Sequence, residues 1–231
     1  MNANVIRFPG SNCDEDVLNV LKNVLNLDAE FIWHDETKLK NPHLVVLPGG
    51  FSYGDYWRAG AMAKISPIVP AIKEFAKEGG LVLGICNGFQ ILTEIGLLPG
   101  ALLKNKNQQF ICDWVNLRVE NTKTPFTTLY KQDSVVRIPI AHSEGRYYID
   151  EAGLETLKKQ NQIVFRYCNP AGKLTEESNV NGSLDSIAGI CNPAGNVLGL
   201  MPHPERCSEA ILGGIDGLPL FQSIVKTFQP A

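Results

Sequence analysis

The sequence predicts an α/β fold, an open and mostly parallel twisted sheet with helices on both faces and added β-hairpins. In the first half, short apolar strands alternate with helical stretches, which is typical of right-handed βαβ units. The segment 81–85 is an unbroken apolar run, as expected of a central parallel strand covered on both faces. The 231 residues contain no repeat or linker, so we expect a single domain over 1–231.

The first half supplies the parallel strands and their helices. Apolar runs predict strands at 5–8, 29–33, 44–47 and 81–85. Asp14, Glu15 and Asp16 fill the first turn of a helix after the first strand, where the helix dipole favours acids. Helical spacing of apolar residues continues this helix to residue 25 and predicts further helices at 66–77 and 91–95.

The second half is richer in β-type residues. Short segments separated by turn signals predict hairpins and late strands that join the same sheet. These segments cover 114–120, 135–140, 163–167, 187–191 and 196–201, and a closing helix covers 218–228.

Composition argues against several classes of protein. Lys and Arg number 21 against 24 Asp and Glu, a net charge of -3, so we expect no nucleic-acid partner. No apolar run approaches the roughly 20 residues of a spanning helix, and the N-terminus lacks the pattern of a signal peptide. In a chain of this length the six cysteines do not resemble a small disulfide scaffold, and the absence of a CxxC pair leaves a zinc or redox pair without local support. We therefore expect a cytoplasmic protein with no metal and no membrane partner.

The stretch Gly84-Ile85-Cys86-Asn87-Gly88 has the pattern of a nucleophile elbow between a buried strand and a helix. The turn is so sharp that its flanking residues must be small, which explains Gly84 and Gly88. The following helix directs its N-terminus at the sulfur of Cys86 and favours the thiolate. The amide of Asn87 is then placed to donate to an oxyanion. The alternative is a buried structural cysteine, which the surrounding motif disfavours.

The other cysteines lack this context. We interpret them as structural, although Cys207 lies close in sequence to His203. They are Cys13, Cys112, Cys168, Cys191 and Cys207.

A thiol nucleophile needs a histidine base that an acceptor orients. His203 follows an apolar strand, and Pro204 biases it towards an extended conformation. Side chains two apart in an extended segment project to one side, so Glu205 can reach a ring nitrogen of His203. The alternative is a structural histidine in a turn stiffened by proline.

His142 is the rival base. It too has an acid two residues later, Glu144, but the segment also carries Arg146 and a glycine, like a loop that contacts substrate. Because catalytic groups favour strand ends, we prefer His203. His34 and His43 have no comparable polar surroundings.

Gly49 and Gly50 follow the third strand. This loop matches neither GxxxxGK[ST] nor a strand-linked GxGxxG, so nucleotide binding here has little support. Instead, Gly50 can bring a bare backbone amide to the ligand as the second oxyanion donor.

Together, the segments 48–50, 84–90 and 203–205 resemble class I, triad-type glutamine amidotransferases. More narrowly, the segments 8–14, 49–56, 139–146 and 201–206 resemble the glutaminase subunits of phosphoribosylformylglycinamidine synthase, of purine biosynthesis. The resemblance implies that Cys86 forms a γ-glutamyl thioester with L-glutamine and that ammonia is released. His203 would act as acid and base, with Glu205 orienting it.

The resemblance also implies that Gly50 and Asn87 form the oxyanion hole and that Gln90 helps to hold the glutamine. It implies a large ATP-dependent synthetase subunit as partner, a small third subunit in many bacterial systems, and a tunnel for ammonia. No cofactor is expected in this chain, since ATP and Mg²⁺ would bind the partner.

Two other classes of function stay open at this point. A stand-alone cysteine hydrolase, such as a peptidase or γ-glutamyl hydrolase, needs the same chemistry. A catalytically silent binding module is disfavoured by the intact Cys86, His203 and Glu205.

Overall fold

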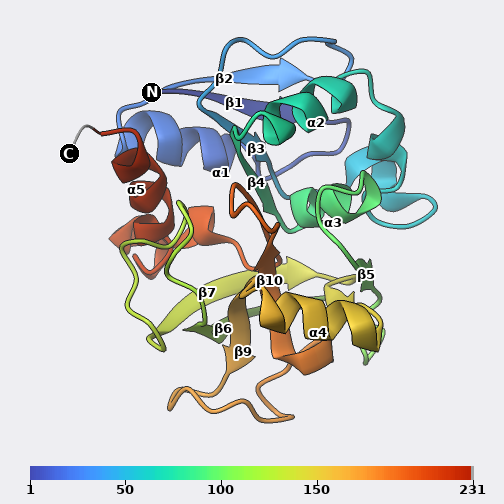
Figure 1. The fold of residues 1–231 in the computed structure, drawn as a ribbon, viewed down its shortest axis with the longest axis vertical. Helices are drawn as coiled ribbons and strands as arrows, with labels where there is room; N and C mark the ends of the chain where they lie inside the picture. The colour runs from blue at the N-terminus through green and yellow to red at the C-terminus, as the bar shows by residue number, and fades with distance from the viewer. Residues whose placement is uncertain (230–231) are drawn as a thin grey trace.

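The computed structural model describes residues 1–229, which form a nine-stranded sheet and a small two-stranded sheet (Figure 1). The order in the large sheet is β2-β1-β3-β4-β11-β10-β9-β6-β7. The first five strands in this order run parallel, and the remaining pairings are antiparallel. The predicted α/β class with added hairpins is confirmed.

The parallel half is built from apolar runs, most of which are buried on both faces, although its edge strand is partly exposed. Its strands are β1 (Asn2–Arg7), β2 (Asp28–Trp33), β3 (Leu44–Leu47), β4 (Leu81–Ile85) and β11 (Val197–Leu200). In Figure 1, helices lie on both sides of β3 and β4. These are α1 (Asp14–Asn19), which continues as a π turn over Val20–Val24, and α5 (Leu218–Thr227) on one side, with α2 (Val69–Lys77) and α3 (Asn87–Glu94) on the other.

The antiparallel half extends the sheet beyond β11. Its strands are β10 (Ile187–Cys191), β9 (Ile163–Cys168), β6 (Ile111–Val119) and β7 (Val135–His142), and β5 (Ala101–Leu103) pairs with β8 (Arg146–Tyr148) separately. The sequence analysis missed the helix α4 (Glu151–Lys159). Its signals were present: the Asp150 side chain accepts from Gly153 N, and Lys158 and Lys159 lie in the last turn.

The strand register determines where the functional segments meet. Leu47 of β3 pairs with Gly84 of β4, and Leu200 of β11 pairs with Ile85, so three neighbouring parallel strands end at the same edge. The loops that follow them therefore converge, as is usual for ligand sites in open α/β sheets. Among residues 1–229, no helix has the length and apolar character required to cross a membrane.

Candidate active site

The turn between β4 and α3 is as sharp as its glycines predict. Cys86 has φ 50° and ψ -105°, a strained conformation for a residue with a side chain. A Cβ atom on Gly88 would lie 1.9 Å from Leu47 O, and one on Gly84 would lie 2.7 Å from Gly88 O. Only glycine fits at these two positions, so α3 can begin directly after Cys86 and close against β3.

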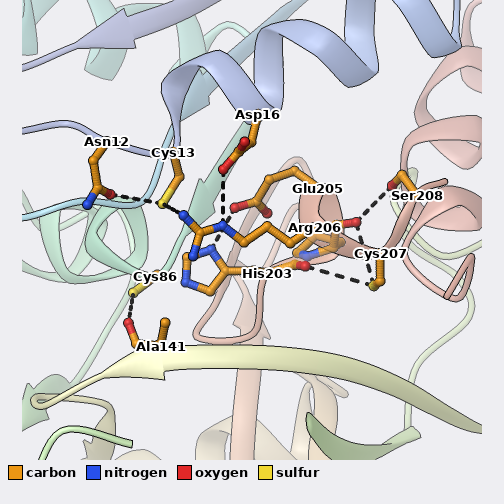
Figure 2. Close-up of polar contacts among 11 residues, drawn as sticks. Asn12, Cys13, Asp16, Cys86, Ala141, His203, Glu205, Arg206, Cys207 and Ser208 are labelled. Atoms are coloured by element: carbon orange, nitrogen blue, oxygen red, sulfur yellow. Dashed lines mark hydrogen bonds and ion pairs between the residues drawn. The ribbon is translucent and has the colours of Figure 1, made fainter. Parts of the chain in front are cut away.

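The Cys86 thiol lies at the N-terminus of α3 and is nearly buried, with 5% of the residue exposed. It donates to Ala141 O over 3.7 Å, a long contact that a rotation of the side chain would release (Figure 2). The helix dipole and the free amides of the first turn of α3 favour negative charge at this position.

His203 and Glu205 form a buried pair beyond the end of β11. Their Nδ1 and Oε1 atoms are 2.6 Å apart, and their side chains are 1% and 0% exposed (Figure 2). The predicted contact is therefore present, although its local cause differs from the extended segment that we expected. The chain enters a short 3-10 helix, Pro204–Cys207, which brings the carboxylate back under the ring.

The electrostatics of this pair favour a charged imidazolium. Burial opposes the charge on His203, but the Glu205 carboxylate and the negative charge available at Cys86 raise the pKa of His203 well above its ordinary value. With Nδ1 tied to Glu205, the other ring nitrogen, Nε2, has no hydrogen-bond partner among the described residues. That nitrogen is free to exchange a proton with a neighbouring thiol.

Gly49 and Gly50 form the wall of the site at the end of β3. A Cβ on Gly49 would lie 2.8 Å from His203 Cε1. Gly50 has φ 150° and pairs with Ser11 in an isolated bridge, and a Cβ there would lie 2.7 Å from Gly10 O. The loop after β1 thus fixes the backbone that we predicted as an oxyanion donor, and a side chain at either glycine would displace it.

Asn87 and Gln90 lie on the first turn of α3 and are buried. The Asn87 side chain accepts from Ser52 N at 3.2 Å and donates to Gln90 Oε1 at 2.9 Å. Gln90 Nε2 in turn donates to Glu144 O at 2.7 Å. Both ends of the Gln90 amide are thereby held by the protein, so its role towards glutamine stays a prediction.

The rival histidine has a different environment. His142 Nδ1 lies 3.1 Å from Asn105 Oδ1, and its Nε2 has no partner among the described residues. Burial and the nearby charge of His203 lower the pKa of His142 to about 3. Glu144 does not orient it, because its Oε2 accepts from Ala59 N at 3.1 Å.

Comparison with known proteins identifies the family. Residues 1–214 match the model of the CobB/CobQ-like glutamine amidotransferase domain. The phosphoribosylformylglycinamidine synthase subunit PurQ of Moorella thermoacetica is 57% identical over 229 residues, which cover 99% of this chain and 97% of that one. The PurQ subunit of Aquifex aeolicus is 54% identical, covering 98% of this chain and all of that one. The chain belongs to the PurQ family.

Solved structures agree with this assignment. A chain of the PurLQS structure from Thermotoga maritima matches with a TM-score of 0.87 and 46% identity, covering 99% of both chains. The glutaminase domain of Trypanosoma brucei CTPS with bound acivicin matches with a TM-score of 0.59 at 14% identity, which shows a shared fold.

The sequence analysis missed one polar residue beside His203. Cys13 lies at the N-terminus of α1, and its Sγ, a nitrogen of His203 and an oxygen of Glu205 lie within 4.8 Å of one another. Arg206 Nη2 donates to Cys13 Sγ at 3.1 Å (Figure 2). No local motif indicated this contact. Its signal was topological, because β1 is parallel to β3 and ends at the same sheet edge.

Proposed function

We propose that this chain is the glutaminase component of a phosphoribosylformylglycinamidine synthase. In this role it hydrolyses L-glutamine and passes the ammonia to a synthetase subunit that converts formylglycinamide ribonucleotide to formylglycinamidine ribonucleotide with ATP. Family membership supports the assignment, and the observation that carries the chemistry is the Cys86 turn beside the buried His203–Glu205 pair.

The first half of the reaction is attack by sulfur. The Cys86 sulfur bonds to the side-chain amide carbon of glutamine, and the carbonyl oxygen becomes an oxyanion that accepts from the backbone amides of Gly50 and Asn87. His203 takes the thiol proton and delivers it to the leaving nitrogen. The carbon–nitrogen bond breaks, ammonia leaves, and a γ-glutamyl thioester stays on Cys86.

The second half is hydrolysis of the thioester. His203 removes a proton from water, the hydroxyl oxygen bonds to the thioester carbon, and the carbon–sulfur bond breaks to release glutamate. Cys86 regains its proton from His203. Glu205 stabilises the imidazolium in both halves, which is consistent with the raised pKa of His203.

The proposal includes the partners and the compartment. A synthetase subunit supplies the ATP and Mg²⁺ chemistry, so this chain needs no cofactor of its own, and a small third subunit completes the complex. The PurLQS structure from Thermotoga maritima supports such an assembly. We expect a cytoplasmic location, which agrees with six cysteines that are all free.

The test compares two nitrogen sources with the assembled complex. Cys86→Ala should lower glutamine-dependent synthesis by at least about 10⁴-fold while leaving synthesis from ammonium salts unchanged. Cys112→Ala, which removes an exposed cysteine, is the matched control and should behave as wild type with both sources. Equal loss from glutamine and ammonium would mean that Cys86 serves folding or assembly instead.

A further inference from the structure

Cys13 is a buried nucleophilic group that the proposed reaction does not use. Only 2% of the residue is exposed, and its thiol donates to Asn12 Oδ1 at 3.0 Å. With His203 and Glu205 it forms a cluster whose ligand atoms lie within 4.8 Å of one another. In Figure 2, Cys13 approaches the histidine from the α1 end, whereas Cys86 approaches it from the β4–α3 turn.

Two members of this cluster have a polar atom that no contact occupies. His203 Nε2 and Glu205 Oε2 are buried and have no hydrogen-bond partner among the described residues. A buried polar atom without a partner is destabilising, so a ligand that binds it is favoured. The proposed reaction gives Nε2 a proton to carry, but it gives Glu205 Oε2 nothing to bind.

The donor types and charges suit a soft divalent cation. A thiolate, an imidazole and a carboxylate are all zinc ligands, and three protein ligands plus water is a common arrangement. The charges of the Cys13 thiolate and Glu205 would balance the cation. Arg206 Nη2 donates to Cys13 Sγ at 3.1 Å, so this contact must be released when the sulfur binds the cation. The positive charge of Arg206 is partly balanced by Asp16, whose Oδ2 lies 3.0 Å from Arg206 Nε.

The geometry requires only a small adjustment. Zinc–ligand bonds of about 2.0–2.3 Å place ligand atoms about 3.5 Å apart. The present ligand atoms lie within 4.8 Å of one another, so the most widely separated pair must close by about 1 Å at most. Rotation about the Cys13 side chain and use of the unpaired Glu205 Oε2 supply movements of this size.

We propose that Cys13, His203 and Glu205 form a binding site for a thiophilic divalent cation such as Zn²⁺, and that the bound cation inhibits the glutaminase by occupying its base. Sulfur–metal, nitrogen–metal and oxygen–metal bonds form. The Cys13 S–H bond and the N–H bond of the coordinating His203 nitrogen break, and both protons go to solvent. Nothing is oxidised or reduced. The inhibition rests on the proposed function, whereas the binding does not.

The test uses the full chain and Co²⁺ as a spectroscopic substitute for Zn²⁺. Wild type, Cys86→Ala and Cys112→Ser should each bind one Co²⁺ with a thiolate-to-metal charge-transfer band. Cys13→Ser and Cys13→Ala should lose this band. In a competition assay their Zn²⁺ affinity should fall by more than about 100-fold, because loss of a group that only supports a metal ligand lowers affinity by up to about 100-fold. Circular dichroism and melting curves check that both Cys13 variants are folded.

Three outcomes would overturn the site. These are a band retained in both Cys13 variants, a band lost in Cys86→Ala, which would assign the metal to the Cys86–His203 pair, and no band in wild type. In the assembled complex, Zn²⁺ should inhibit glutamine-dependent synthesis at the concentration that saturates binding, and spare ammonium-dependent synthesis. If metal-free enzyme lacked glutaminase activity while the Co²⁺ band persisted, the proposed function would fail and the metal site would stand.

Discussion

Three segments of this chain place a histidine two residues before a glutamate, and the fold gives the two buried ones, at His203 and His142, opposite environments. Both His203 and His142 are buried, with 1% and 2% exposed. The Nδ1 atom of His203 meets Glu205 at 2.6 Å, whereas that of His142 meets the neutral side chain of Asn105 at 3.1 Å. As a result, the pKa of His203 is raised and that of His142 is lowered.

The backbone after each histidine explains the difference. Pro204 begins a 3-10 helix, which returns Glu205 to the ring of His203. His142 is the last residue of β7, and the chain beyond it carries Glu144 away to the backbone of Ala59. The comparison shows that His-x-Glu spacing does not by itself make a hydrogen-bonded pair. The turn that follows the histidine decides whether the acid contacts it.

The largest expected difference between the two segments is in turnover. His203→Ala should lower glutamine-dependent synthesis by about 10³-fold or more, because both proton transfers lose their carrier. His142→Gln, which can keep a hydrogen bond to Asn105, should stay within about 10-fold of wild type. Steady-state assays of the complex with glutamine and with ammonium salts measure both effects. An inactive His142→Gln beside an active His203→Ala would reverse the assignment.

Substitutions of Glu205 and Glu144 should differ in their effect on turnover in the same direction as those of the two histidines, but by a smaller factor. Glu205→Gln should lower glutamine-dependent kcat by about 10²-fold, less than loss of the nucleophile, because it weakens the orientation and charge of His203 without removing the base. Glu144→Gln is the matched control, with the same spacing and the same chemical change, and its kcat should be near that of wild type. Similar losses in the two variants would show that the contact between Glu205 and His203 is not what turnover requires.

Local sequence predicted those parts of the site that depend on local geometry. The glycines around Cys86 are required by atoms within a few residues or on the adjacent strand, so their pattern was sufficient. The parallel order of β3, β4 and β11 followed from alternating strands and helices, and it brought Gly50, Cys86 and His203 to one edge.

Contacts between distant segments could not be predicted in this way. Cys13 reaches His203 only because β1 lies beside β3, and Asn105 reaches His142 across 37 residues. Neither residue lies in a recognisable motif for its contact. The helix α4 was missed for a different reason, since its capping signal at Asp150 lies within a region whose composition favours strands.

The two histidines should also give opposite pH effects on stability. With a folded pKa of about 3 against an ordinary 6.5, His142 binds a proton in the unfolded state before it does so in the native state. Its contribution is therefore full above pH 6.5 and falls as the pH drops towards 3, by about 2 kcal/mol between pH 8 and pH 5. The raised pKa of His203 has the reverse sign, because its contribution is present below 6.5 and lost as the pH rises through the folded value.

Urea unfolding at pH 5 and pH 8 measures this contrast. The difference in free energy of unfolding between the two pH values should shrink by about 2 kcal/mol in His142→Gln relative to wild type. An unchanged difference would mean that His142 titrates normally in the folded protein, which would remove the electrostatic distinction between the two segments.

The smallest effect concerns what Glu144 does in place of orienting a histidine. Burial, and then the negative charge of Glu144, raise the pKa of Asp55 to about 6, against a hydrogen bond from the Gly60 backbone that lowers it. The native state thus holds a proton that the unfolded state loses near pH 4, so the free energy of unfolding falls as the pH rises from about 4 to 6.

Asp55→Asn should remove this loss. Because Asp55 is only partly buried, solvent screening limits the gain to about 1 kcal/mol or less at pH 7–8, and the gain should vanish below about pH 4. Asp35→Asn, at an exposed carboxylate, serves as the control, and melting temperatures across the pH range provide the measurement. Since Glu144 is one source of the shift, Glu144→Gln should produce part of the same gain. If the gain in stability of Asp55→Asn persisted at pH 4, its cause would be improved packing. The charge of Glu144 would then not be a source of the effect.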